Sequence, residues 1–187
     1  MDQQRLYSAC ESGDLKVIQQ LHARGAAMDV TQPNHQGWTP MFIACFYGHL
    51  DIVKWLHAHG AAMDVTRPNN NGATPMYVAC QNGHFEIVHW LHAHGAAMDV
   101  TQPANDGWTP MLIACEKGHL EIVQWLHAHG AVMDVNPKRG ELQCTSRVRM
   151  VISRSSNGFT RTVLPWMSRD QTTREQLHST SHVMKVI

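Results

Sequence analysis

The amino-acid sequence predicts an all-α repeat solenoid, in which stacked helix-turn-helix units carry projecting hairpin arms. Three observations support this prediction. Blocks that begin at Gly37, Gly72 and Gly107 repeat one another at an offset of 35 residues. Each block holds two short apolar patterns with helical spacing, and a segment rich in Pro and Asn follows them. A period of about 20 to 50 residues is the signature of a solenoid, because one such unit cannot bury its apolar face alone.

The first helix of each complete block is expected to begin at a Thr-Pro pair. In the first complete block, Thr39 can cap the helix and Pro40 suits its first position. Ile43 and Ala44 then continue one apolar stripe. Gly48 interrupts the pattern, so the sequence predicts a short helix that ends there.

The second helix of the block follows directly. Its amphipathic pattern is formed by Leu50, Ile52, Val53 and Leu56. Gly60 is expected to close this helix as a left-handed cap. The stretch MDVTRPNNNG comes next, corresponding to MDVTQPNHQG in the preceding unit, and its Pro, Asn and Gly residues are typical of an extended arm that turns back on itself.

The recurring motifs resemble a known family. Gly-x-Thr-Pro, then Ala-Cys-x-x-Gly-His-Leu-x-Ile-Val, then His-Gly-Ala is similar to the ankyrin repeat, from about Arg5 to Val135. The family's Thr-Pro-Leu-His departs here, because apolar or aromatic residues stand where the family has His: Phe42, Tyr77 and Leu112. The period is also 35 rather than about 33 residues. The extra pair falls in GAAMDV, so we expect a longer or bulged arm there.

The chain is predicted to divide into an ankyrin-like array over residues 1–136 and a basic tail over residues 137–187. The array contains about four units: 5–36 (partial), 37–71, 72–106 and 107–136 (truncated). It holds 6 Lys and Arg against 12 Asp and Glu, whereas the tail holds 9 against 3. The tail is rich in Ser, Thr and Arg and has no sustained period, which favours disorder or loose packing. Two alternatives stay open for it: a cap on the array, or the product of a misassembled reading frame.

Four of the five cysteines follow the repeat. Cys10, Cys45, Cys80 and Cys115 lie 35 residues apart, each after an Ala in an apolar stretch. This spacing fits neither a disulfide framework nor a C-x-x-C zinc site. We therefore expect them to be reduced thiols in the core.

The N-terminal segment has no basic and apolar pattern of a signal peptide, and no run of about 18 apolar residues occurs. These observations predict an intracellular protein, cytoplasmic with the nucleus as an alternative, and no membrane contact. The net charge of zero gives no general attraction to nucleic acid. Basic stretches in the tail lack interleaved aromatic residues, so nucleic-acid binding is not expected.

Histidines are dense in the stretch WLHAHGA, which occurs three times. A zinc site needs three or four ligands that converge on one point. His57 and His59 are two residues apart and point to different sides of a helix, while equivalent histidines of stacked units are about 8–10 Å apart. Of the local pairs, His89 and His92 alone have a workable spacing. We therefore predict no metal site, and a histidine-rich metal-binding protein stays as an alternative function.

Catalytic signatures are missing from the sequence. It contains no nucleophile elbow, no phosphate-binding G-x-x-x-x-G-K-[ST] loop and no H-E-x-x-H motif. We predict a non-enzymatic protein-protein interaction module that acts as a monomeric scaffold, with no cofactor and no small-molecule substrate. A truncated fragment of a larger ankyrin-containing protein is the other alternative.

Partner specificity is expected where the units differ from one another, because stacking fixes the scaffold residues. By resemblance to ankyrin proteins, these positions lie on a concave face that binds partner proteins. The predicted partner-binding residues are His35, Gln36, Trp38, Phe46, Tyr47, Asn70, Asn71, Gln81, Asn82, Asn105, Asp106, Trp108, Glu116 and Lys117.

Aromatic residues among them are the expected anchors, because aromatic side chains dominate interface hot spots: Trp38, Trp108, Phe46 and Tyr47. Packing against a neighbouring arm is the alternative for the two tryptophans. The tryptophans of the second helix are expected in the core or between units: Trp55, Trp90 and Trp125.

The histidines also predict a pH dependence. If His57, His92 and His127 are partly buried and neutral, folding should weaken as the pH falls toward and below about 6.5. The reason is that the unfolded chain then binds more protons than the folded chain.

Overall fold

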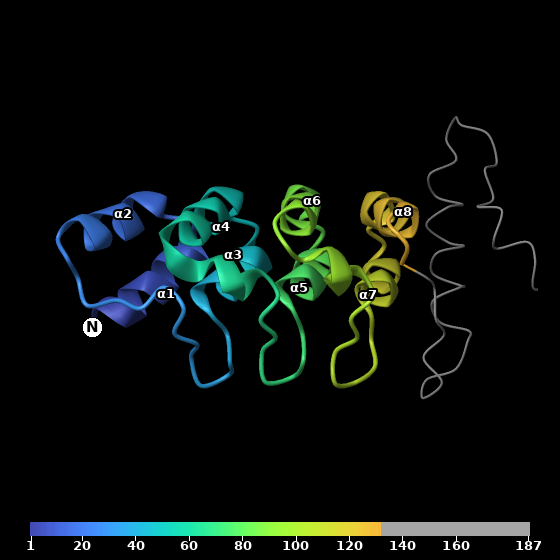
Figure 1. The fold of residues 1–187 in the computed structure, drawn as a ribbon, viewed down its shortest axis with the longest axis horizontal. Coiled ribbons are helices and arrows are strands. Elements are labelled where there is room, and N and C mark those ends of the chain that lie inside the picture. Colours follow the sequence, from blue (N-terminus) through green and yellow to red (C-terminus); the bar gives the residue numbers. More distant parts are fainter. Residues whose placement is uncertain (132–187) are drawn as a thin grey trace, which may run out of the picture. The chain divides into compact units, whose positions relative to one another are not determined.

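The structure is a computed structural model, and it describes residues 1–131. Within this range eight α-helices alternate between two rows (Figure 1). The first row consists of α1 (Asp2–Ser12), α3 (Pro40–Tyr47), α5 (Pro75–Asn82) and α7 (Pro110–Lys117). The second row consists of α2 (Leu15–Ala23), α4 (Leu50–Leu56), α6 (Phe85–Ala93) and α8 (Leu120–Ala128). The predicted boundary after Asn136 and all predictions for residues 137–187 lie outside the described residues.

Helix pairs stack to form the core. In the first row α1 packs on α3, α3 on α5 and α5 on α7, while each second-row helix packs on the first-row helix of its own unit. The side chains between the rows, such as Met41, Ile52 and Leu56, are fully buried. Between successive units the chain forms arms that project on the side of the first row (Figure 1). The predicted all-helical solenoid is confirmed.

The Thr-Pro pairs start the first-row helices as predicted. The Thr39 hydroxyl oxygen accepts a hydrogen bond from the backbone N–H of Phe42 at 3.1 Å, and Pro40 occupies the first helical turn. Thr74 and Thr109 cap α5 and α7 in the same way. The Phe42 side chain is 1% exposed, so apolar packing takes the place of the family's His.

In the second and third units the GAAMDV segment forms a short helical turn at the start of the arm. These turns are the 3-10 helices η2 (Ala62–Val65) and η3 (Ala97–Val100), and the segment η1 (His57–Ala61), which is kinked at His59 and Gly60, precedes η2. Each 3-10 turn buries an Asp and a Val and exposes a Met. The bulge predicted in GAAMDV therefore exists, and it lies next to the second helix.

The repeating cysteines are free thiols buried in the core, as predicted: Cys10, Cys45, Cys80 and Cys115. Burial raises the pKa of the Cys10 thiol to about 12, with a smaller contribution from the charge of Glu11. Burial also raises the pKa values of Cys45 and Cys80. These thiols therefore stay protonated at neutral pH and serve as small apolar side chains. The fifth cysteine lies outside the described residues.

Candidate functional site

An aromatic cluster extends from the core of the second unit to its surface. We define it as Trp38, Phe42, Phe46 and Tyr47. The Trp38 ring lies 5.1 Å from Phe42 and 5.3 Å from Phe46, between ring centroids, and Phe46 contacts Tyr47 edge to face at 5.1 Å. Phe42 is buried, Trp38 and Phe46 are half-buried, and Tyr47 is 45% exposed. Three predicted anchors thus come together, and Trp38 packs on rings of its own unit.

The units differ in one row of first-row helix residues, which we call the floor row: Glu11, Phe46, Gln81 and Glu116. A histidine of the next unit binds the backbone of each of the first three. His49 Nε2 lies 3.1 Å from the carbonyl oxygen of Glu11, and His84 Nε2 lies 3.1 Å from that of Phe46. His119 makes the same contact to Gln81 at 3.1 Å. The backbone of the row is therefore held in register, while its side chains vary.

The arm tips are joined by a second set of contacts. The backbone N–H of Asn70 donates to the carbonyl oxygen of Gln36 at 3.2 Å, and its side-chain amide donates to that of His35 at 3.0 Å. Asn105 repeats this arrangement on the carbonyl oxygens of Asn71 and Asn70, at 2.9 and 3.2 Å. Two predicted binding residues, Asn70 and Asn105, thus hold neighbouring arms together. His35, Gln36, Asn71 and Asp106 are exposed beside them.

The third and fourth units present mainly polar groups at the other predicted positions. Gln81 and Asn82 are half-buried, and the Asn82 amide donates to the carbonyl oxygen of Val78 at 3.0 Å. Lys117 lies 3.7 Å from the Glu116 carboxylate. Trp108 is half-buried. The fourth unit therefore differs in chemical character from the aromatic second unit.

Two carboxylates, those of Asp106 and Glu116, lie near Tyr77. The pKa of Tyr77 is raised to about 12, first by burial and then by the carboxylates of Asp106 and Glu116. A phenol that responds to both carboxylates lies in a negative local potential.

The WLHAHGA segments form aromatic triads between units. In the first triad, His59 stacks on Trp55 with ring centroids 3.9 Å apart and an angle of 12°. His59 Nδ1 lies 2.7 Å from the Trp55 carbonyl oxygen, to which it donates. His22 of the preceding unit packs edge to face against both rings, at 5.5 and 5.1 Å. Two further triads have the same form: His57 with Trp90 and His94, and His92 with Trp125 and His129.

These triads confirm inter-unit packing for Trp55, Trp90 and Trp125. They also contain contacts between histidines of successive units. Each of these His–His contacts joins residues 37 positions apart, as in His22 and His59, because the second histidine of one unit reaches back to the first histidine of the previous one. Comparison of equivalent positions, 35 residues apart, could not reveal these pairs.

The arrangement of the histidines bears on the metal-binding alternative. Across residues 1–131, no three His, Cys, Asp or Glu side chains gather closely enough to hold a metal ion. In the triads, the paired imidazoles of successive units stand at angles of 75° to 81°. Packing between aromatic faces and edges accounts for this arrangement.

His92 gives the predicted pH dependence a structural basis. It is half-buried, and its ring lies 4.9 Å from those of Trp125 and His129. Burial lowers its pKa, and the neighbouring imidazoles of His129 and His89 lower it further. His57 is also half-buried, but His127 is exposed, so that part of the prediction is wrong.

We expect His92 to reduce stability as the pH falls through about 6.5, because the unfolded chain takes up its proton first. The His92→Gln variant removes this effect. The difference in Tm between the wild type and His92→Gln should therefore shift in favour of the variant between pH 7.5 and pH 5.5. His35→Gln, at an exposed arm tip, is the control. An unchanged difference for His92→Gln would show that its imidazole is equally solvated in both states.

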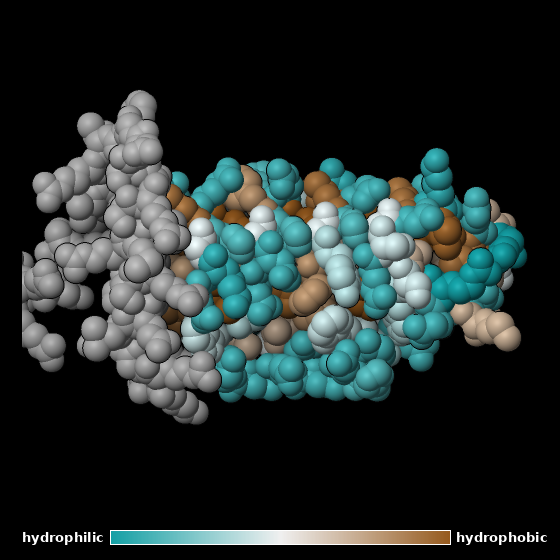
Figure 2. Space-filling model, turned by 180° about the vertical axis from the view of Figure 1, so that it is seen from behind, coloured by the Kyte–Doolittle hydropathy of each residue, from teal (hydrophilic) through white to brown (hydrophobic). Residues whose placement is uncertain are grey.

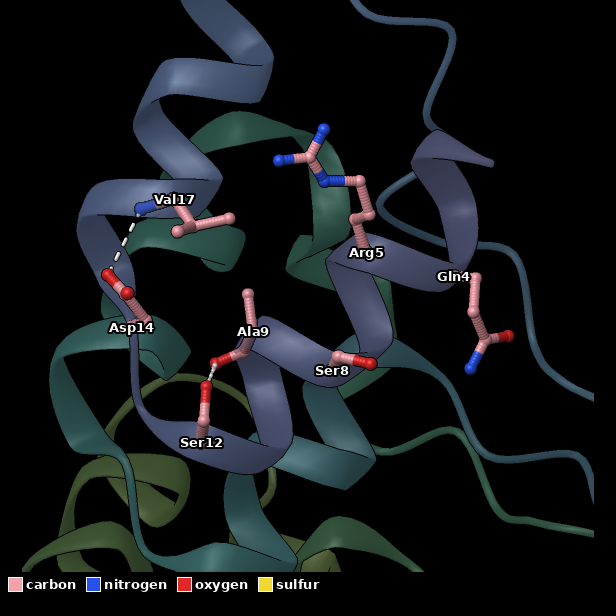
Figure 3. Close-up of a pocket in the computed structure, with 7 residues that line it drawn as sticks. All are labelled: Gln4, Arg5, Ser8, Ala9, Ser12, Asp14 and Val17. Atoms are coloured by element: carbon pink, nitrogen blue, oxygen red, sulfur yellow. Dashed lines mark hydrogen bonds between the residues drawn. The ribbon is translucent and has the colours of Figure 1, made fainter.

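A shallow hollow of about 310 Å³ lies between α1 and α2 at the outer face of the first unit (Figure 3). Its lining combines polar and apolar surface, with Gln4, Arg5 and Ser8 on one side. Asp14 accepts a hydrogen bond from the backbone N–H of Val17 at 3.1 Å, so its carboxylate is used as a helix cap. The hollow brings together no group of catalytic residues.

None of the helices within the described residues combines the length and the apolar character needed to cross a membrane.

Two rows of stacked helices, with Thr-Pro at the start of α3, α5 and α7 and with projecting arms between units, define a helical repeat protein. Family models described as ankyrin repeats match the chain over residues 6–102 and residues 83–127. The chain therefore belongs to the ankyrin-repeat family. No curated protein matches it as a relative.

Proposed function

We propose that this chain is a non-enzymatic interaction module that binds a protein partner through the floor row and the arm tips, on the face that is concave in ankyrin proteins. Ankyrin repeats generally mediate protein-protein interaction. The observation that carries the proposal is the position of the variation between units. The floor row changes from Glu to Phe to Gln to Glu, while the buried residues and the WLHAHGA segments repeat almost unchanged.

Rigidity supports the same proposal. The histidine contacts fix the backbone of the floor row, and the contacts of Asn70 and Asn105 fix the arms. A preorganised surface loses little conformational entropy on binding, so more of the contact energy appears as affinity. We propose a monomer, because the described stacking needs no second copy. We also propose an intracellular compartment, where ankyrin repeats are common.

A pull-down from the native source, in which mass spectrometry identifies the partner, tests the proposed binding face. Trp38→Ala combined with Trp108→Ala should reduce recovery of the partner by more than tenfold, because half-buried aromatic anchors contribute about 2 kcal/mol or more each. Lys54→Ala, on the exposed side of α4, is the control and should retain the partner. Full retention by a folded double variant would count against this face.

A further inference from the structure

The floor row has an order of chemical character that favours one kind of partner. It reads acidic, aromatic, polar and acidic, in the sequence Glu11, Phe46, Gln81 and Glu116. The histidine contacts hold the first three backbones at one unit per step. Neighbouring packed helices are about 8–10 Å apart, so Glu11 and Phe46 present their side chains about one such step apart.

The aromatic cluster forms a contact surface and does not enclose a binding cavity. Phe46 contacts Trp38 and Tyr47 at centroid distances of 5.3 and 5.1 Å, which leaves no room for a group between these rings. The exposed part of Tyr47 and the half-exposed rings beside it can therefore cover one apolar side chain of a partner from outside. The arms run as a hydrophilic row along the lower edge of the array (Figure 2).

One exposed carboxylate, that of Glu11, precedes Phe46 by one unit in the floor row. The Glu11 side chain is exposed, and no hydrogen bond or ion pair within residues 1–131 involves its carboxylate. Farther along the array, the carboxylates of Asp106 and Glu116 help to raise the pKa of Tyr77, and Lys117 offsets part of the charge of Glu116. Residues 1–131 hold 11 Asp and Glu against 6 Lys and Arg. A partner with basic groups beside an apolar one is thus complementary to this face.

We propose that the partner is an extended peptide segment that places an apolar side chain on the aromatic cluster and a Lys or Arg side chain at Glu11. This inference rests on the proposed function. An extended chain advances about 3.3 Å per residue, so one step of about 8–10 Å corresponds to about three residues. A second basic residue, about five to six residues from the apolar one on the other side, would reach Glu116 more weakly.

Selection from a random library of displayed 12-residue peptides on the immobilised full chain tests this inference. We expect enriched peptides to carry an apolar residue and, about three residues away, Lys or Arg. Affinity of the consensus peptide, measured by fluorescence anisotropy, should fall at least tenfold for Phe46→Ala. It should fall about threefold to tenfold for Glu11→Gln at low salt, and less at high salt. Glu86→Gln, an exposed acid on α6, is the matched control and should change nothing.

The outcomes separate this inference from the proposed function. Peptides that depend on Phe46 but carry no basic residue, and ignore Glu11→Gln, would overturn the inference and support the face. Peptides whose affinity changes with neither variant would count against both. Recovery of no binding peptide would overturn the peptide class, while the pull-down tests the face separately. Circular dichroism of each variant establishes that it folds.

Discussion

Replacing Gly48 with Ala is expected to destabilise the array by about 2–4 kcal/mol. Gly48 ends α3 with a φ of +87°, a conformation that costs an L-residue about 1–2 kcal/mol. A Cβ there would also lie 2.5 Å from Cε1 of His84. The His84 ring would have to move, and its contact with the Phe46 carbonyl oxygen, about 1 kcal/mol, would weaken.

Gly25→Ala is the matched control for this substitution. Gly25 also has a positive φ, +67°, but no atom lies within 4 Å of the position its Cβ would take. It should therefore lose only the conformational part, about 1–2 kcal/mol. Urea unfolding of both variants gives the two free energies. Equal losses would mean that the His84 ring does not constrain the helix end.

Replacing Asp99 with Asn is expected to stabilise the protein at pH 7.5 by about 1–2 kcal/mol. Asp99 lies in η3 and is 8% exposed, and its Oδ2 has no hydrogen-bond partner among residues 1–131. Burial raises its pKa to about 6, from an ordinary value near 3.9. The folded protein therefore holds an unfavourable carboxylate at neutral pH, and a neutral amide removes most of that cost.

The raised pKa of Asp99 also predicts how the effect of this substitution on stability changes with pH. Because the pKa of Asp99 is raised by folding, its protonated form stabilises the protein below about pH 4, and that contribution is lost as the pH rises through about 6. The advantage of Asp99→Asn should shrink as the pH falls over this range. An advantage that does not depend on pH would contradict the account.

Asp29 is the control, since it holds the equivalent position in the first unit. It is exposed, and its Oδ1 accepts hydrogen bonds from the Thr31 hydroxyl at 2.7 Å and the Thr31 N–H at 2.8 Å. These bonds lower its pKa. Asp29→Asn should therefore change stability in the opposite direction, as a loss at pH 7.5 that disappears in acid.

The repeated features of the fold follow from the sequence. Thr39 and Gly48 mark a helix start and stop by local chemistry, and a period of 35 residues forces the helices to stack. The burial of the repeated aspartates could not be predicted from the motif. Asp29 and Asp99 share one motif, yet one is exposed and the other buried. Only the latter lies in a 3-10 turn, and a repeated motif cannot show which copies adopt that turn.

The candidate site likewise contains residues that the sequence could predict and contacts that it could not. Phe46 and Tyr47 could be predicted as candidate anchors because the other units have polar residues at these positions, whereas Trp38 recurs as Trp108 in the fourth unit. The structural use of the Asn70 amide was not predictable, since it depends on the approach of the preceding arm. The contact of His84 with Phe46 likewise joins two units, and spacing within one unit gives no sign of it.

Side-chain footprinting of the complex with the partner found by pull-down tests the central claim most directly. Hydroxyl radicals label exposed aromatic and sulfur-containing side chains, so one experiment reports on both sides of the array. We predict that the partner protects Trp38, Phe46 and Tyr47, and leaves Met63 and Met98, which are 84% and 81% exposed on the 3-10 turns, labelled as in the free protein. Protection of the two methionines with an unprotected aromatic cluster would contradict the account.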